Sequence, residues 1–116
     1  MDAKKFVDVL NIVVRDAAVK NTISILESPP GRKPDKEIIE LSEFYNKQAE
    51  NDRRLMKKII KYVADDAVFG MLCVLDGVRA IEDDNKGELM LNYHSDKNTI
   101  ITLNIKKDLH DIYNID

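Results

Sequence analysis

Residues 52–80 read DRRLMKKIIKYVADDAVFGMLCVLDGVRA, and this stretch decides the fold of the chain. In its first half, apolar side chains recur every three or four residues, which places them on one face of an α-helix. These side chains are Leu55, Met56, Ile59, Ile60, Val63, Ala67 and Val68. Between Ala67 and Leu75 no side chain is charged or strongly polar, so a helix there is apolar on all sides. We therefore predict a long central helix over about 52–76, whose second half must be enclosed by the rest of the chain or by a second subunit.

Two further helices are predicted before the central one. The first spans about 2–27, and the Ser-Pro-Pro-Gly run at 28–31 ends it because proline cannot donate the helical hydrogen bond. The second spans about 34–47, since a proline followed by an aspartate suits the first turn of a helix. A short connection at 48–51 leads to the central helix, so we expect these last two helices to pack as an antiparallel hairpin.

The end of the central helix carries two glycines with different expected roles. Gly70 lies inside the apolar run, where glycine costs about 1 kcal/mol relative to alanine, and this indicates a close helix approach or a local bend. The pair Asp76-Gly77 is a stronger helix breaker, because glycine suits the left-handed conformation that ends many helices. The sequence leaves open whether this pair caps the helix or turns the chain into a short extended segment at 78–81.

The C-terminal part of the chain changes to the two-residue period of β-structure. Apolar and polar residues alternate over 88–94 and again over 99–105, which predicts an antiparallel β-hairpin with one face packed on the helices. Helical spacing returns over 107–114 and predicts a short terminal helix. We thus predict a single α+β domain, 1–116, with a three-helix layer around a long central helix, a C-terminal antiparallel β-hairpin and a short terminal helix.

The composition is that of an ordinary globular protein. Apolar residues make up 44% of the chain and charged residues 34%, and a net charge of −3 argues against a protein that coats nucleic acid or anionic lipid. The single cysteine, Cys73, excludes an intramolecular disulfide, and we interpret it as a small buried hydrophobe. We find no targeting segment and no apolar run near the roughly 20 residues that span a bilayer, so we expect a cytoplasmic protein.

The motifs of the common catalytic and cofactor sites are missing from the sequence. It contains no glycine-rich phosphate loop, no Cys-x-x-Cys, no His-Glu-x-x-His and no Gly-x-Ser-x-Gly. We therefore predict no catalytic, cofactor-binding or metal-binding residue. Function is expected to reside in surfaces that bind a partner.

Two groups of charged residues are candidates for such a surface. The first is basic and occupies the opening turns of the central helix, where positive charge opposes the helix dipole and so is not required for stability. Its members are Arg53, Arg54, Lys57, Lys58 and Lys61. The second is acidic and follows the central helix; together with Asp76 it could hold a divalent cation or form a solvated loop. Its members are Glu82, Asp83 and Asp84.

A third group combines histidines with carboxylates. Glu88 and His94 lie on the outward face of the first predicted strand, and His110 lies beside Asp111 in the tail. We expect both histidines to be exposed. Because imidazole titrates near neutrality, such a set could carry out general acid–base chemistry, as in metal-independent ribonucleases. A surface or capping role is the plainer interpretation.

Two segments resemble known bacterial proteins. Phe69-Gly-Met-Leu-Cys-Val-Leu-Asp-Gly-Val-Arg-Ala-Ile-Glu82, followed by a hairpin and by Leu109-His110-Asp111-Ile112-Tyr113, resembles a pattern in small uncharacterised bacterial proteins with a Leu-Asp-Gly turn and a Leu-His-Asp tail. In size and architecture the chain is also similar to immunity proteins that neutralise polymorphic and contact-dependent toxins. Those proteins share no catalytic motif, so the similarity transfers no site and implies only a protein partner.

From these observations we favour a non-catalytic, cytoplasmic protein-binding module without a cofactor, and most concretely a toxin immunity protein. One alternative is a small hydrolase, such as a metal-independent nuclease that uses His94 or His110. Another is a nucleic-acid-binding protein that uses the basic group at 53–61. Homodimerisation is compatible with all three, because the apolar central helix and a lone hairpin both leave surface to cover. A membrane partner is not expected.

Overall fold

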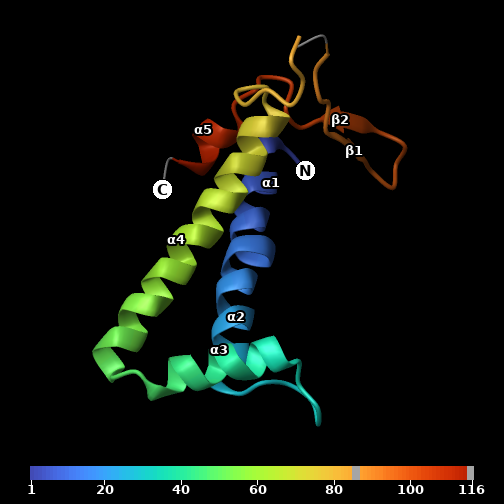
Figure 1. Cartoon of the computed structure of the whole chain (residues 1–116). Helices are drawn as coiled ribbons and strands as arrows, with labels where there is room; N and C mark the ends of the chain where they lie inside the picture. Colours follow the sequence, from blue (N-terminus) through green and yellow to red (C-terminus); the bar gives the residue numbers. More distant parts are fainter. Residues whose placement is uncertain (85–86, 115–116) are drawn as a thin grey trace. The chain divides into compact units, whose positions relative to one another are not determined.

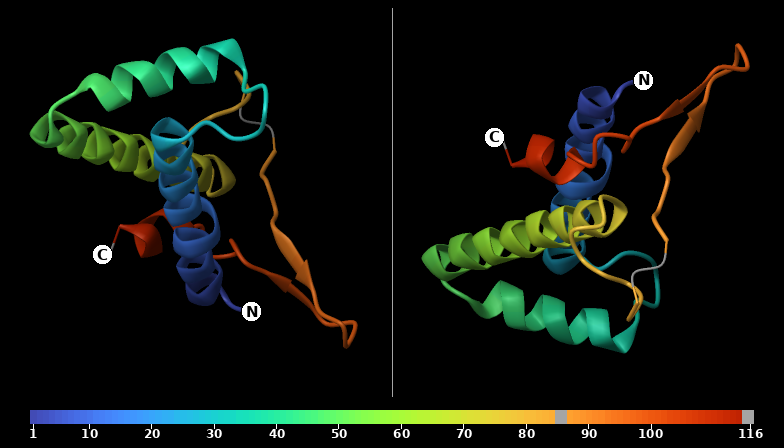
Figure 2. Two further views of the ribbon diagram at one scale, coloured as in Figure 1. Left: turned by 90° about the horizontal axis from the view of Figure 1, so that it is seen from below. Right: turned by 90° about the horizontal axis from the view of Figure 1, so that it is seen from above.

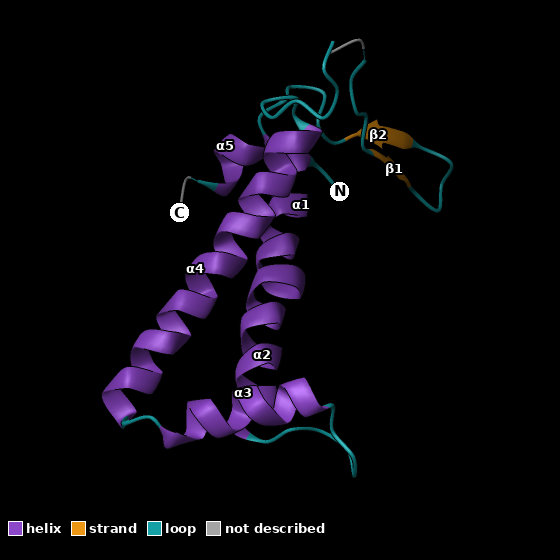
Figure 3. Cartoon of the chain, viewed as in Figure 1, coloured by secondary structure: helices purple, strands orange, loops and turns teal. Residues whose placement is uncertain are grey.

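The computed structural model describes residues 1–84 and 87–114. It divides into two compact units: residues 1–14 with 66–116 form unit 1, and residues 15–65 form unit 2. The long helix α4 (Glu50–Leu75) contributes to both units (Figure 1). The predicted α+β class is confirmed, since helices are accompanied by an antiparallel β-hairpin and a short terminal helix (Figure 3). The single domain remains a prediction.

The predicted first helix is present, but its middle is π-helical. Helix α1 (Ala3–Leu10) begins at Asp2, whose carboxylate accepts a hydrogen bond from the Lys5 backbone N–H at 2.8 Å. It passes into η1 (Asn11–Asp16), a π-helical segment, and then into α2 (Ala17–Glu27). The wider π turn shifts the side chains that follow it away from α-helical spacing, and the apolar pattern alone does not reveal such a turn.

In unit 2, helix α3 (Lys36–Lys47) begins after its cap, Asp35, and packs against α2. The buried Ser42 donates a hydrogen bond from Oγ to the carbonyl oxygen of Leu26 at 2.7 Å. Asn46 Nδ2 donates to the same oxygen at 3.2 Å. The last carbonyls of a helix lack partners within that helix, so these bonds fix the C-terminal end of α2 on α3.

The expected antiparallel hairpin of α3 and α4 is wrong. The two helices diverge from their short connection instead of lying side by side (Figures 1 and 2). Helix α4 also begins at Glu50, slightly before the expected start at about residue 52. The physical reason is that α3 turns its hydrogen-bonding side chains toward the end of α2, and this contact sets its direction.

Unit 1 is built around the second half of α4. Its buried core comes from α1, α4 and α5 (Leu109–Tyr113). The core residues are Val7, Val68, Leu72, Leu109 and Tyr113. Cys73 is also buried, as predicted. Met71 is exposed, so the rest of the chain does not enclose this half of α4 on all sides, and the alternative of enclosure by a second subunit remains a prediction.

The glycine that follows α4 caps the helix. Gly77 has a φ of +78°, its N–H donates to the Val74 carbonyl at 3.1 Å, and the Val78 N–H donates to the Cys73 carbonyl at 2.9 Å. This pair of bonds is the Schellman motif, in which a left-handed residue lets the chain satisfy the last carbonyls of a helix. Residues 78–81 contain bends and no strand, so the structure selects the cap from the two alternatives.

At Gly70, where a close helix approach or a local bend was expected, the nearest atoms belong to a side chain. A Cβ atom built on Gly70 would lie 2.6 Å from Nη1 of Arg79. The guanidinium group therefore lies directly over the glycine. A larger residue at this position would displace it.

The β-hairpin is shorter and more exposed than predicted. Strands β1 (Asn92–His94) and β2 (Ile100–Thr102) pair antiparallel, in place of the longer strands 88–94 and 99–105. All three residues of β1 are exposed, and so are the first two of β2. The expected packing of one face of the strands on the helices is therefore wrong.

A buried asparagine holds the base of the hairpin on the end of α4. Asn104 Nδ2 donates to the carbonyl oxygens of Leu75 at 2.7 Å and Leu89 at 2.8 Å, and its Oδ1 accepts from the Leu91 N–H at 2.8 Å. The neighbouring Leu103 is buried as well. The buried residues of this region therefore lie beside the strands. The Asn104 amide can be buried there because its hydrogen bonds avoid the cost of an unpaired polar group.

Candidate functional site

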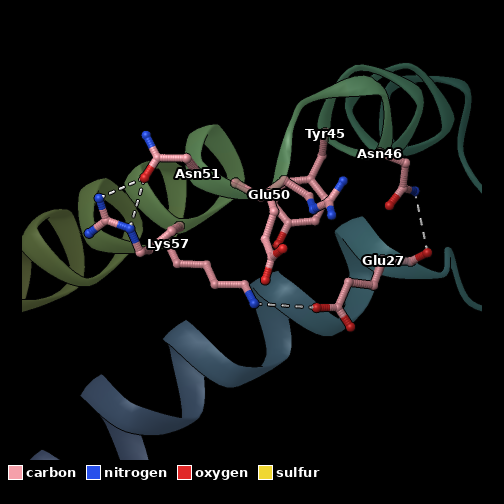
Figure 4. Close-up of a pocket in the computed structure, with 8 residues that line it drawn as sticks. Glu27, Tyr45, Asn46, Glu50, Asn51 and Lys57 are labelled. Atoms are coloured by element: carbon pink, nitrogen blue, oxygen red, sulfur yellow. Dashed lines mark hydrogen bonds and ion pairs between the residues drawn. The ribbon is translucent and has the colours of Figure 1, made fainter.

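Unit 2 contains a hollow of about 860 Å³ that is lined by the ends of α2 and α3 and by the first turns of α4 (Figure 4). Its lining includes three cations and two carboxylates. The lining residues are Glu27, Tyr45, Asn46, Glu50, Asn51, Arg53, Arg54 and Lys57. We call this site the basic hollow.

The first turns of α4 place the cations of the basic hollow. Arg53 and Lys57 are four residues apart and therefore share one face of the helix. Arg53 Nη1 donates to the Gln48 carbonyl oxygen at 2.6 Å, while Arg54 donates to Asn51 Oδ1 from Nη2 at 2.9 Å and from Nε at 3.2 Å. A guanidinium carries five N–H donors in a planar fork, so these bonds orient both arginines and use only part of their donor capacity.

Lys57 is held by a loose ion pair. Its Nζ lies 3.8 Å from Glu27 Oε1, and both side chains are about half exposed (Figure 4). Exposed ion pairs of this kind contribute only about 0–1 kcal/mol because water screens them. A carboxylate from a partner can therefore replace Glu27 on Lys57 at little cost.

Tyr45 is one of the residues that line the basic hollow, and its hydroxyl group is buried. The residue is 1% exposed, and its hydroxyl has no hydrogen-bond partner among the residues that the structure describes. A buried polar group in this state costs about 1–3 kcal/mol. A ligand oxygen that enters the hollow would remove this cost, because the phenol can donate a hydrogen bond to it.

The structure divides the basic group that the sequence singled out. Arg53, Arg54 and Lys57 line the basic hollow. Lys58 and Lys61 are exposed and lie outside this lining. The hollow therefore takes three of the five basic side chains.

Sequence reasoning missed the contributions of α2 and α3 to the hollow. Glu27 ends α2, and Tyr45 and Asn46 lie in the last turn of α3. No spacing along the chain relates these residues to the start of α4, because they belong to different helices. The available signal was a polar residue at the C-terminal end of each helix, Glu27 in α2 and Asn46 in α3.

The acidic group after α4 is divided in the same way. A second hollow, of about 650 Å³ and within unit 1, is lined by Glu82 and Glu88 together with Lys107, whereas Asp83 and Asp84 are exposed outside its lining. Lys107 Nζ lies 2.7 Å from Glu88 Oε2. The hydrogen bond from Lys107, reinforced by its positive charge, lowers the pKa of Glu88. These residues therefore form a mixed-charge surface.

The two histidines lie in different surroundings. His94 is exposed on β1, whereas the His110 side chain is only 16% exposed and contacts Asp76. The expected exposure of both histidines is therefore wrong for His110. Neither histidine lines either hollow. Within the described ranges, no three His, Cys, Asp or Glu side chains are grouped so that they could hold a metal ion.

Asp76 anchors the terminal helix to the end of α4. Its fully buried side chain accepts a hydrogen bond at Oδ2 from the His110 backbone N–H at 2.9 Å, and the same oxygen lies 2.6 Å from His110 Nδ1. The ring of Phe69 contacts the imidazole edge-on, with 6.3 Å between centroids. Asp76 is thus a structural anchor and does not belong to a solvated acidic loop.

Cys73 does not offer a nucleophile. Burial raises the pKa of the Cys73 thiol; the positive charge of Arg79 opposes this shift, and the negative charge of Asp76 adds to it. The thiolate is the reactive form of cysteine, so a raised pKa makes the side chain inert near neutral pH.

Comparison of the chain with protein-family models, with curated proteins and with solved structures finds no match in any of the three. Among the described residues, no helix combines the length and the apolar character that crossing a membrane requires. The basic hollow is therefore interpreted from its own chemistry.

Proposed function

We propose that the chain is a non-catalytic protein-binding module of the cytoplasm, and that its binding site is the basic hollow. The partner is a protein with an acidic segment, and the inhibition of a bacterial toxin is the most concrete form of this function. The observation that carries the proposal is that three cations line the hollow together with Tyr45, whose buried hydroxyl has no partner among the described residues. A carboxylate satisfies both features, because it accepts from a phenol and from the planar fork of an arginine.

A single carboxylate suits the hollow better than a row of phosphates. Glu27 and Glu50 offset two of the three cations of the lining, so the hollow keeps the positive charge of one cation, which balances one carboxylate but not a continuous phosphate backbone. The net charge of −3 is also opposite to that of a typical nucleic-acid-binding domain. We therefore favour a protein partner, and the experiment below separates the two classes.

The test compares capture of a partner by two charge-reversed variants. Arg53→Glu/Lys57→Glu reverses two cations of the hollow. The matched control, Lys20→Glu/Lys106→Glu, reverses two exposed lysines outside its lining and changes the net charge by the same amount. Lysate of the native host, treated with nuclease, is passed over each immobilised protein, and the retained proteins are quantified by mass spectrometry.

We expect a protein that the wild type and the control retain equally and that the hollow variant retains about tenfold less, because reversed charges repel an acidic segment. Calorimetric titration with that purified protein should repeat the difference and show weaker binding at high salt. Equal retention by both variants would contradict the proposal. Proteins that are retained from untreated lysate but not from nuclease-treated lysate would favour nucleic acid instead.

A further inference from the structure

Helix α3 exposes apolar side chains next to carboxylates. Leu41 and Phe44 lie one turn apart and are 49% and 59% exposed. Glu37 and Glu40 are also exposed and precede these two residues by four positions each. Residues four apart are neighbours on a helix surface, so each apolar side chain adjoins a carboxylate. We call these four residues the acidic face.

Helix α4 exposes an apolar stripe that adjoins a lysine. Leu55, Ile59 and Tyr62 recur at intervals of four and three residues and are 44%, 63% and 74% exposed. Lys58 is exposed between them, three residues after Leu55 and four before Tyr62. We call these four residues the basic face. Neither face shares a residue with the lining of the basic hollow.

We propose that a second copy of the chain covers both faces in a two-fold symmetric dimer. The acidic face of each chain packs on the basic face of its partner, so one symmetry axis generates two identical contacts. The apolar side chains supply the driving force, since contiguous exposed apolar surface of this kind marks an interaction site. The carboxylates of Glu37 and Glu40 meet Lys58 at the rim and set the register.

A second copy suits these faces better than an unrelated protein. An acidic protein would match the basic face but would be repelled by the acidic face, and a basic protein would meet the reverse problem. A second copy presents the required opposite face to each. Within one chain both faces stay exposed, so neither satisfies the other.

The test is a charge swap followed by analytical ultracentrifugation. We expect the wild type to sediment at twice the mass of one chain. Lys58→Glu or Glu40→Lys places like charges opposite each other at both copies of the contact, so each variant alone should dissociate about 100-fold more readily. Mixed in equal amounts, the two variants should form a heterodimer, because their reversed residues face each other at one contact while the other contact is unchanged.

Two controls separate the interface from general effects of charge or folding. Lys20→Glu changes the net charge equally at an exposed site of α2 and should dimerise like the wild type. Far-ultraviolet circular dichroism should show the same helix content in all variants. A wild type that stays monomeric at every concentration, a Lys58→Glu variant that dimerises as tightly as the wild type, or a mixture that stays monomeric would overturn the proposal.

Discussion

Buried polar side chains in this protein occur in two opposite states. The side chain of Asn104 makes three hydrogen bonds and joins the hairpin to α4. The hydroxyl of Tyr45 is equally inaccessible, yet it has no partner within the described residues. Single side-chain oxygens of Asn11, Asp76 and Asp108 share this state. Most buried polar groups in folded proteins are paired, so each such atom calls for an explanation. At the edge of a cationic hollow, the explanation we favour is a ligand that completes the pairing.

Replacement of Tyr45 by phenylalanine tests that explanation. The variant removes an unsatisfied hydroxyl and leaves the ring in place, so the free energy of unfolding should stay equal or rise by up to about 1 kcal/mol. Binding of the partner should weaken about tenfold, because a hydrogen bond to a charged acceptor is lost. Urea denaturation and calorimetric titration measure the two effects. A destabilised variant with unchanged binding would place the hydroxyl in the fold instead of the site.

The Asp76–His110 contact predicts that the two histidines differ in their contribution to stability. His110→Ala leaves the carboxylate of Asp76 buried without its side-chain partner and should lower the free energy of unfolding by about 3 kcal/mol. His94→Ala, at an exposed strand position, should change it by less than about 0.5 kcal/mol. Denaturant titration of the two variants gives the comparison, and equal effects would argue against the anchor.

The Glu88–Lys107 ion pair makes a prediction about titration. Because the hydrogen bond and charge of Lys107 lower the pKa of Glu88, Lys107→Met should raise it toward the ordinary value of a glutamate side chain. The control is Lys106→Met, which removes a neighbouring charge without removing this contact. Carboxyl chemical shifts followed by NMR across acidic pH report the Glu88 pKa. If both variants left it unchanged, the ion pair would not persist in solution.

At the scale of elements, the cap of α4 is the clearest link from a single residue to a boundary. Gly77→Ala places a side chain on a residue in the left-handed conformation, which destabilises the folded state. Alanine also reduces the conformational entropy of the unfolded chain, which offsets part of this cost, so the free energy of unfolding should fall by about 1 kcal/mol. Gly87→Ala is the control, since a Cβ at Gly87 meets nothing within 4 Å. Thermal or urea unfolding distinguishes the two, and an equal response would contradict the role of the cap.

Helices were more predictable than the hairpin for a physical reason. The apolar period and the glycine signal are local, so the expected helix over 52–76 differs from α4 (Glu50–Leu75) by only one or two residues. The alternation over 88–94 reflects the potential to pair as a strand. The chain instead buries Leu103 and partly buries Leu91, both beside the strands, and leaves most strand residues exposed. Which of the alternating residues pack on the core depends on tertiary contacts, and the sequence pattern alone does not predict those contacts.

The same distinction explains how much of the candidate site could be predicted. Arg53, Arg54 and Lys57 lie within two helical turns, so their shared location follows from sequence spacing. Glu27 and Tyr45 reach the hollow only because α3 packs on α2. That packing depends on Ser42, Asn46 and their bonds to the end of α2, which no residue pattern specifies in advance.

At the scale of the whole molecule, both proposals place binding surfaces in unit 2 but on different residues. The basic hollow uses Arg53 and Lys57, whereas the dimer contact uses Lys58 with the apolar stripe beside it. Adjacent positions on α4 thus point to different surfaces, because successive residues on a helix are about 100° apart. A protein built this way can pair with itself and still present one hollow per chain.

This separation predicts that self-association and partner binding fail independently. Arg53→Glu/Lys57→Glu should lose the partner and remain a dimer, because its substitutions lie outside both dimer faces. Lys58→Glu should become a monomer and still bind the partner with an affinity within about threefold of the wild type, since Lys58 lies outside the lining of the hollow. Sedimentation velocity of each variant with the purified partner would show one partner per chain in both the dimeric wild type and the monomeric variant. If Lys58→Glu lost the partner along with the dimer, the two surfaces would have to be one, and the hollow would bind its partner only in the assembled pair.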